Sequence, residues 1–281
     1  MKVAITGAGG LVGQHLARTF ATDCEVRALL HADLDITDGA AVRAWCERER
    51  PALLVNCAVI DVDRCEREPA LAQAVNVDGP RNLAEAASAI GAEVLHFSTN
   101  YVFDGRTHGR VYTQADVAVP LNNYGRTKLA GEHAVQSANP HSYIVRTSWV
   151  FGPGKESFLA SLPRKLRAGK RVRAITDVWA SATYVNDLVV RVAEVLARRR
   201  YGVYHVVNGG VCSYHDYALE CARLVGAEPN ELIEAVSEDQ AKRLAERPRY
   251  TPLHCVLSAE LGLPPLRDWR AALAAFVNDE G

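Results

Sequence analysis

The sequence has no excess of charge of either sign and no long apolar run. Its 281 residues include 32 Lys or Arg and 33 Asp or Glu, which gives a formal net charge of -1. This even balance argues against a broad basic surface for nucleic acid or for anionic lipids. No apolar run approaches the roughly 20 residues that a membrane-spanning helix needs. We therefore expect neither a nucleic acid nor a membrane as a partner.

Paired cysteines and metal-ligand patterns are missing as well. The seven cysteines are odd in number and scattered, with no C-x-x-C spacing, which is typical of reduced thiols. The N-terminal segment 1–5 enters a strand pattern directly, without the apolar segment of a secretion signal. His205, His215 and His254 show no metal-ligand spacing. We expect a cytoplasmic protein without a metal centre.

What the sequence does contain is a regular alternation of short apolar runs and helical patterns. Hydrophobic residues make up 48% and charged residues 23% of the chain, as in ordinary globular proteins. Continuous apolar strands that alternate with helices predict a parallel sheet covered on both faces. The predicted fold class is therefore α/β, a Rossmann-type doubly wound parallel sheet. Strands are expected at residues 3–6, 26–30, 53–56, 94–98 and 143–146, and helices at 11–20, 39–49, 70–90 and 129–136.

The alternation breaks after about Phe151, where Gly152-Pro153-Gly154 forms a turn cluster. Beyond it, helices are expected at 159–168, 185–196 and 213–224, and a strand at 204–207. No internal repeat or low-complexity tract separates the two parts. We expect a first domain at 1–150 and a smaller C-terminal lobe at 151–281, with the segment near 184–208 returning to the first domain.

A glycine-rich loop follows the first strand. Gly7, Gly10 and Gly13 have the spacing G-x-x-G-x-x-G and lie between a predicted strand and a predicted helix. Glycine permits a tight turn and lets backbone N–H groups approach a pyrophosphate. The start of the helix adds a partial positive charge. The loop predicts that the first domain binds NAD(P).

The end of the second strand bears on the choice of cofactor. A carboxylate there would bind the ribose 2′-OH of NAD and repel a 2′-phosphate, but this strand ends in Leu30-His31. The sequence therefore favours NADPH, with His31 near the phosphate, and leaves NADH open. Asp35 and Ile36 are the expected neighbours of the adenine.

Tyr124 and Lys128 are the candidate catalytic pair. They are four residues apart, so on a helix they share a face. A nearby cation stabilises a phenolate and lowers the Tyr pKa from its usual value of about 10. Ser98-Thr99 ends the fourth strand, and ligands of open α/β sheets bind beyond the carboxyl ends of strands. A hydroxyl there can stabilise charge on a substrate oxygen to which the Tyr gives a proton.

Together with further segments, these motifs carry a family resemblance. The order of the glycine loop, the strand-end hydroxyl and the Tyr/Lys pair along the chain resembles that of the extended short-chain dehydrogenases/reductases. Over essentially the whole chain the sequence more closely resembles the nucleotide-sugar 4-ketoreductases, typified by dTDP-4-dehydrorhamnose reductase. The segments that carry this resemblance are LDITD at 34–38, VNCA at 55–58, STNYVFDG at 98–105, YGRTKLAGE at 124–132, RTSWVFG at 146–152, GVYH at 202–205, RP at 247–248 and DWRAAL at 268–273.

The resemblance implies a chemistry and a set of roles. Hydride would pass from NADPH or NADH to C4 of a nucleotide-activated, dTDP-linked 4-keto-6-deoxysugar in deoxysugar biosynthesis. Tyr124 would protonate the oxygen, Thr99 would hold it, and Lys128 would bind the nicotinamide ribose and lower the Tyr124 pKa. A homodimer is expected from the habit of the family. The implied cofactor contacts are Gly10, Leu11 and Val12 at the pyrophosphate and Cys57, Ala58 and Val59 along the cleft.

The substrate contacts are less uniform. Trp149 would pack near the sugar or the nicotinamide, although a buried core Trp is an alternative. Arg247 could bind the diphosphate, or be exposed and without a role. The family usually has Asp where this chain has Asn100, and D-Q-x-G-x-P-T where this chain has DVWASAT at 177–183. These departures place Val and Ala where small or polar residues usually face the substrate, which indicates a different sugar.

Two other functions share this scaffold. One is a non-catalytic NADP-binding subunit like the regulatory subunit of methionine adenosyltransferase, which loss of the Tyr or Lys would favour. Here both residues are present. The other is a nucleotide-sugar epimerase or dehydratase. A dehydratase would need an acid/base group beside the strand-end hydroxyl, and Asn100 does not supply one.

Overall fold

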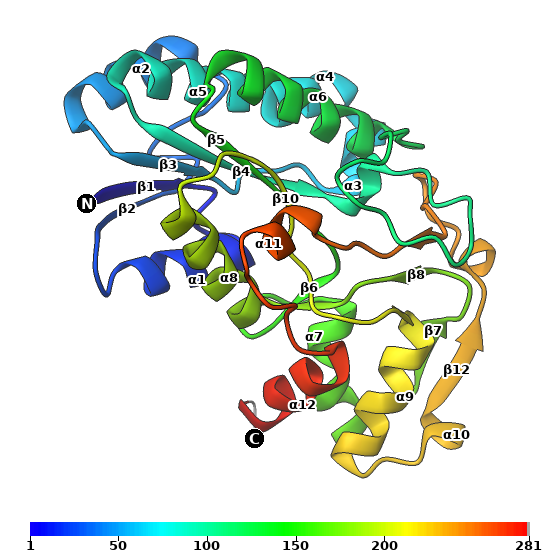
Figure 1. Cartoon of the computed structure of the whole chain (residues 1–281). Coiled ribbons are helices and arrows are strands. Elements are labelled where there is room, and N and C mark those ends of the chain that lie inside the picture. The colour runs from blue at the N-terminus through cyan, green and yellow to red at the C-terminus, as the bar shows by residue number, and fades with distance from the viewer. Residues whose placement is uncertain (280–281) are drawn as a thin grey trace.

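A six-stranded, fully parallel sheet forms the centre of the computed structural model, which describes residues 1–279 (Figure 1). Its strand order is β10-β5-β4-β3-β1-β2. The order reverses between β1 and β3, so a ligand cleft is expected beyond the carboxyl ends of these two strands. The strands are β1 (Lys2–Thr6), β2 (Glu25–Leu29), β3 (Leu53–Asn56), β4 (Glu93–Thr99), β5 (Ser142–Thr147) and β10 (Gly202–His205).

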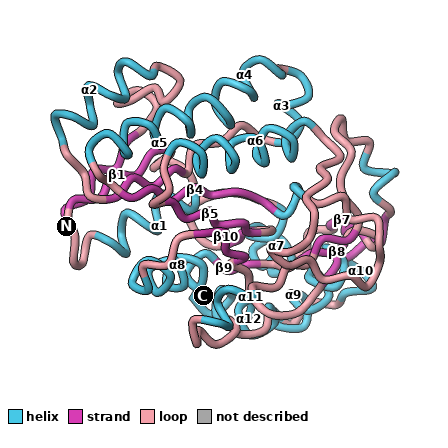
Figure 2. Tube along the Cα trace, turned by 45° about the horizontal axis from the view of Figure 1, so that its top comes forward, coloured by secondary structure: helices cyan, strands magenta, loops and turns pink. Residues whose placement is uncertain are grey.

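Helices cover both faces of this sheet (Figures 1 and 2). One face packs against α2 (Gly39–Glu49), α5 (Gly79–Ile90) and α6 (Asn123–Ala138), and the other against α1 (Leu11–Phe20) and α8 (Val185–Arg198). Alternate strand residues serve the two cores: Ala4 and Leu54 face α2 and α5, whereas Val3 and Val55 face α1 and α8. Burial on both faces explains why the strands read as continuous apolar runs.

A smaller lobe lies beyond the carboxyl end of the sheet. It is built on three small sheets, β11-β8-β13, β12-β7 and β6-β9. Its strands are β6 (Val150–Phe151), β7 (Val172–Ile175), β8 (Trp179–Ala180), β9 (Thr183–Tyr184), β11 (Cys212–Ser213), β12 (Ile233–Val236) and β13 (Tyr250–Thr251), and its helices are α7 (Phe158–Arg167), α9 (Tyr214–Val225), α10 (Pro229–Leu232), α11 (Val256–Glu260) and α12 (Trp269–Asp279).

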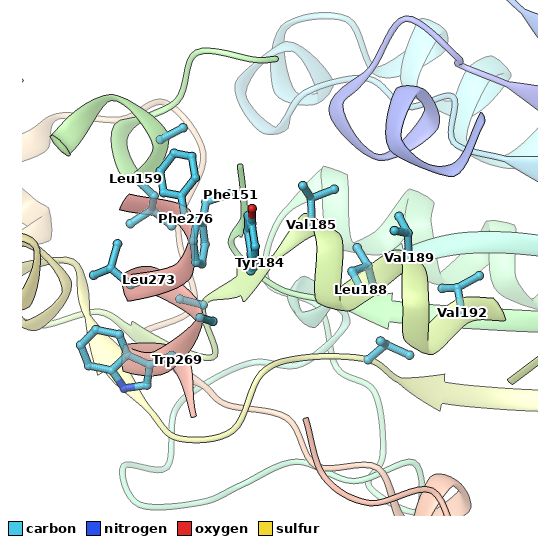
Figure 3. Close-up of a cluster of buried hydrophobic side chains, with 14 of the residues drawn as sticks. Phe151, Leu159, Tyr184, Val185, Leu188, Val189, Val192, Trp269, Leu273 and Phe276 are labelled. Atoms are coloured by element: carbon cyan, nitrogen blue, oxygen red, sulfur yellow. The ribbon is translucent and has the colours of Figure 1, made fainter. Parts of the chain in front are cut away.

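One continuous apolar core joins the lobe to the sheet. Figure 3 shows α8 contributing Val185 and Leu188 at one end, and α12 contributing Phe276 at the other. Phe151 and Tyr184 lie between the two helices and stack with ring centroids 5.6 Å apart. The lobe is therefore fixed to the sheet by packed apolar side chains. Within residues 1–279, no helix is long and apolar enough to cross a bilayer.

Most predicted elements lie where the sequence placed them. Strand β10 pairs with β5 at the edge of the six-stranded sheet, and α8 packs against α1. Two predicted elements differ in extent. The helix expected at 70–90 consists of α4 (Pro69–Gln73), a π-helical turn (Ala74–Asp78) and α5, since Pro80 has no N–H with which to continue regular pairing. Helix α6 begins at Asn123, six residues before the expected Leu129. The remaining short elements are α3 (Val62–Arg67), η2 (Asn100–Val102) and η3 (Glu238–Ala241).

Candidate functional site

A cleft of about 500 Å³ opens at the carboxyl ends of β1 and β3. It gathers segments that are far apart in the sequence: the glycine loop, the segment after β2 and the segment after β3. Most of the residues expected at the cofactor line it. They are Gly7, Gly10, His31, Asp35, Ile36, Cys57, Ala58 and Val59, joined by Thr6, Leu34, Ile60, Arg64, Leu71, Val75 and Lys155.

The three loop glycines have different reasons to be glycine. Gly7 has φ +67°, and a Cβ there would lie 2.5 Å from the Ala58 nitrogen. A Cβ on Gly13 would lie 2.6 Å from the Gly7 carbonyl oxygen. Gly10 is less confined, with its nearest such contact at 3.3 Å, and as the N-cap of α1 it offers no side chain to the helix amides. The first turn, which includes Leu11 and Val12, is therefore left uncapped, as an anion site requires.

The segment after β2 holds the two residues that bear on cofactor choice. His31 is 84% exposed, with its Nδ1 atom 3.9 Å from Asp35 Oδ1. Asp35 Oδ1 accepts hydrogen bonds from the Thr37 amide at 2.9 Å and the Thr37 hydroxyl at 2.8 Å. These bonds lower the pKa of Asp35 below its ordinary value. Both side chains lie at the cleft, and the hydrogen bonds of the Asp35 carboxylate are made within its own turn, to Thr37.

Two cations at the cleft were not anticipated from the sequence. Arg64 of α3 lies at the wall and makes a bidentate ion pair with Glu68 at 2.9 and 3.1 Å. Lys155 reaches the cleft from the loop after β6. Within the described residues, no carboxylate lies within 4.0 Å of the Lys155 amine. No local pattern marks either residue, because only the fold brings them to the glycine loop.

Tyr124 and Thr99 meet at the carboxyl end of β4. Thr99 is the last residue of that strand, and Tyr124 lies in the first turn of α6. A hydrogen bond with Thr99 lowers the Tyr124 pKa, but burial outweighs it and raises that pKa well above its ordinary value. The Tyr101 ring packs edge-on against the phenol, with centroids 5.8 Å apart. Tyr124 is therefore a protonated phenol beside a strand-end hydroxyl.

Lys128 lies one turn further along α6 and is buried. Its Nζ atom donates to the Phe97 carbonyl oxygen at 2.6 Å and lies 3.2 Å from His96 Nε2. Burial lowers the pKa of Lys128 from 10.5 to about 8. The sequence predicts that Lys128 lowers the Tyr124 pKa. In this structure that pKa is raised by burial, and Lys128 is directed to His96 and Phe97 instead.

Asn100 ties the site to the C-terminal lobe. Its Nδ2 donates to Thr251 Oγ1 of β13 at 2.7 Å, and its Oδ1 accepts from Thr99 Oγ1 at 3.2 Å. Ser98, the residue before Thr99, faces away from the site and donates to Glu132. Glu132 in turn forms a buried ion pair with Arg146 at 2.7 Å. Of the two strand-end hydroxyls, Thr99 is thus the one directed to Tyr124.

Trp149 lies on the lobe side of the site. It has the uncommon φ of +42° and stacks on Tyr214, with centroids 3.8 Å and planes 24° apart. Only part of it is buried, against the cluster of Ile175 and Val178. The Trp149 ring therefore packs into the lobe core and still leaves part of its surface accessible.

Arg247 is buried. The alternative prediction from the sequence, an exposed arginine without a role, is therefore wrong. The Arg247 guanidinium donates to both oxygens of Asp63 at 3.0 and 2.9 Å and to the Ala245 carbonyl at 2.8 Å. The ion pair lowers the Asp63 pKa. It ties the C-terminal lobe to α3, next to the cleft wall.

The segment 177–183, where this chain departs from the family pattern, lies in the core of the C-terminal lobe. Val178 is buried with Ile175 and Val236, and Ala180 and Ala182 are fully buried. Short strands on both sides of β8 draw this segment into the lobe core, which explains its apolar composition. Among residues 1–279, no group of three or more His, Cys, Asp or Glu is arranged to hold a metal.

Comparisons with known proteins agree along the whole chain. A family model described as the RmlD substrate binding domain matches residues 1–281. The dTDP-4-dehydrorhamnose reductase of Mycolicibacterium smegmatis is 42% identical over 276 residues, which cover 97% of this chain and 84% of that protein. The dTDP-4-keto-6-deoxy-D-glucose reductase of Streptomyces niveus is 36% identical over 272 residues, 96% of this chain and 94% of that protein.

The fold is shared with a solved structure. The crystal structure of dTDP-4-dehydrorhamnose reductase from Bacillus anthracis, in complex with NADP, superposes with a TM-score of 0.94. Its sequence is 30% identical, and the match covers 99% of each chain.

Proposed function

The chain belongs to the family of the RmlD substrate binding domain, and from that membership we propose that it is an NADPH-dependent oxidoreductase. It reduces the C4 keto group of a dTDP-linked 4-keto-6-deoxysugar, as the names of its relatives support. The observation that carries this proposal is the contact between Thr99 and Tyr124 at the strand end. It provides a protonated phenol and a hydroxyl where a carbonyl substrate would meet a cofactor.

The cleft fits a dinucleotide. Its volume of about 500 Å³ is within the range of small-molecule sites. The cradle at Gly7 and Gly13 has no room for a Cβ, and the uncapped start of α1 provides amide donors for a pyrophosphate. His31 lies at the cleft with its Nδ1 atom 3.9 Å from Asp35 Oδ1, an oxygen that accepts two hydrogen bonds from Thr37. Its ring nitrogens support a preference for a 2′-phosphate, hence for NADPH over NADH. Bound there, the reduced nicotinamide supplies the hydride that reaches C4.

Tyr124 provides the proton that completes the alcohol. The phenol is protonated at neutral pH and is available as an acid, and burial raises its pKa further. The Thr99 hydroxyl, whose proton goes to Asn100 Oδ1 in this structure, would turn to donate a second hydrogen bond to the same substrate oxygen and stabilise the charge that develops there. Lys128 binds the nicotinamide ribose from the next turn of α6.

The lobe supplies the substrate contacts in this proposal. Trp149 offers the part of its ring not covered by Tyr214 to the sugar or nicotinamide. Asn100 fixes Thr99 relative to β13. Arg247, held by its ion pair with Asp63 beside the cleft wall, supplies positive charge for the diphosphate. The division at residue 150, a homodimer and a cytoplasmic location belong to the proposal and rest on the family resemblance.

The test is consumption of reduced cofactor. The purified protein is mixed with NADPH, or with NADH, and a dTDP-4-keto-6-deoxysugar, and the nicotinamide absorbance is followed. Substrate-dependent oxidation that is faster with NADPH is expected. Tight NADPH binding without oxidation across several keto-sugars would instead support a regulatory subunit, and interconversion of sugars without net oxidation would support an epimerase.

A further inference from the structure

A row of buried polar side chains crosses the carboxyl end of the sheet. Thr6 of β1, Asn56 of β3 and His96 of β4 are register neighbours on adjacent strands. They point to the face covered by α5 and α6, as Ala4 and its register neighbours do two residues earlier. Lys128 of α6 meets the end of this row at His96. A polar row that is fully buried is costly unless each member is paired.

The direction of hydrogen bonding along the row is fixed by one backbone amide. The Ala58 N–H, which can only donate, lies 3.0 Å from Asn56 Oδ1. The Thr6 hydroxyl donates to the same oxygen at 2.9 Å. Asn56 therefore faces His96 with its NH₂ group, 3.1 Å from Nδ1. Nδ1 accepts this bond, so the ring proton of neutral His96 must lie on Nε2.

That proton points at Lys128. The Nε2 atom lies 3.2 Å from Nζ, and an ammonium group has no lone pair with which to accept. Only the neutral amine satisfies this contact. The second partner of Nζ, the Phe97 carbonyl oxygen, can accept from either form.

We propose that His96 is a positioning residue that, with its proton held on Nε2 by Asn56 and Ala58, fixes Lys128 and favours its neutral amine. The row thereby links residues that line the cofactor cleft, Thr6 and Ala58, to the protonation state of Lys128. A simple packing role for His96 would not require this order of donors and acceptors.

The groups around Lys128 agree with this assignment. The titratable side chains that face it are His96 on β4, Glu132 on α6, Cys57 after β3 and Cys65 on α3. Glu132 and the thiols favour the charged amine, but burial outweighs them and lowers the Lys128 pKa to about 8. Burial lowers the pKa of His96 well below its usual value, and Lys128 adds to this whenever its amine is charged, so the ring stays neutral in both states of Lys128.

The functional meaning of this inference rests on the proposed function. A lysine that titrates near pH 8 can take up and release a proton one turn from Tyr124, whereas an ordinary lysine stays charged in that range. The test itself is independent of turnover, so a failure of the proposed reaction and a failure of this inference can be told apart.

The 281-residue chain provides the measurement by NMR. It has six lysines, of which Lys128 is the buried one, so labelling at the lysine side chain gives a small set of signals, and Lys128→Met identifies the one of interest. We expect its titration midpoint to lie about two pKa units below that of a free lysine. We also expect ¹⁵N shifts of His96 that show a protonated Nε2. A protonated Nδ1 would overturn the proposal.

Two carboxamide variants separate tuning from packing. His96→Gln keeps a polar group near Nε2 that can turn its oxygen to Lys128, and should raise the Lys128 midpoint by about one unit. His96→Asn keeps a partner for Asn56 near Nδ1 but loses the contact with Lys128, and should raise it less. Thermal unfolding is measured for both. A midpoint unchanged in His96→Gln, in a variant that remains folded, would show that His96 only packs.

Discussion

Tyr124 illustrates how much of the proposed chemistry is decided at a single residue. Its phenol is protonated at neutral pH, and burial, which outweighs the hydrogen bond with Thr99, raises its pKa above the ordinary value. We expect Tyr124→Phe to lower kcat by roughly 10²–10⁴-fold, the range of general acid catalysis, with the Kd for NADPH changed little. Thr99→Val should lower kcat less, because the phenol keeps its proton. Steady-state kinetics and fluorescence titration give the two constants, and a Tyr124→Phe enzyme within tenfold of wild type would exclude Tyr124 as the acid.

The catalytic residues could be predicted from the sequence, but their electrostatics could not. Tyr124, Lys128 and Thr99 follow from spacing and from the position of Thr99 at a strand end. The raised Tyr124 pKa depends on burial, and the direction of Lys128 depends on His96 and Phe97, which are contributed by another strand. Such contacts join residues about 30 positions apart and leave no local pattern.

Helix α6 carries both Tyr124 and Lys128, and its first turn is fixed by Asn122. The Asn122 side chain accepts from the Gly125 amide at 2.7 Å and donates to the Glu246 carbonyl at 2.8 Å. We expect Asn122→Ala to lower the free energy of unfolding by about 1–2 kcal/mol and also to lower kcat, because Tyr124 lies in that turn. Urea unfolding and kinetics on the same preparation measure the two effects.

Asp38→Ala is the matched control for this cap. Asp38 caps α2 by accepting from the Ala40 and Ala41 amides at 3.0 Å, and α2 carries none of the catalytic residues. It should lose comparable stability while kcat at saturating NADPH stays close to wild type. An equal fall of kcat in both variants would mean that general destabilisation, and not the placement of Tyr124, limits turnover.

Helix α6 begins at Asn123, six residues earlier than the period of apolar residues in the sequence predicts. The sequence placed α1, α2 and β3 at their observed bounds, because apolar residues recur through each. The first turns of α6 are polar and contain Gly125, where a Cβ would lie 2.2 Å from the Tyr101 carbonyl oxygen. That glycine is required by the close approach of η2 and reads from the sequence as a helix breaker.

At the scale of the whole molecule, the cleft is completed by residues from different parts of the chain. Lys155, from the loop after β6, lines it with no carboxylate within 4.0 Å in the described part of the chain, whereas Arg64 is neutralised by Glu68. We expect Lys155→Gln to raise the Kd for NADPH several-fold, and Arg64→Gln to raise it less. The effect of Lys155→Gln should shrink with added salt. Equal affinities of Lys155→Gln and wild type at low salt would contradict an electrostatic role.

The buried histidines make the whole fold sensitive to acid. His205 is the last residue of β10, donates through Nδ1 to the His254 carbonyl oxygen at 3.0 Å, and has a pKa lowered by burial to about 3. Burial lowers the pKa of His96 in the same direction. An unfolded histidine takes up a proton below about pH 6.5, which these two do not do in the folded state. Stability is therefore fully present above pH 6.5 and is lost as the pH falls towards 3.

We expect the free energy of unfolding to fall between pH 6.5 and 5 with a slope of up to about 1.4 kcal/mol per pH unit for each buried histidine. His205→Asn keeps a donor near Nδ1 and removes one titrating group. The slope should therefore decrease by up to about 1.4 kcal/mol per pH unit, the contribution of one proton, whatever the free energy of unfolding at pH 7. His133→Asn, on the exposed side of α6, should leave the slope as in wild type. Chemical unfolding at a series of pH values measures it, and a slope unchanged in His205→Asn would show that His205 does not contribute to the loss of stability in this pH range.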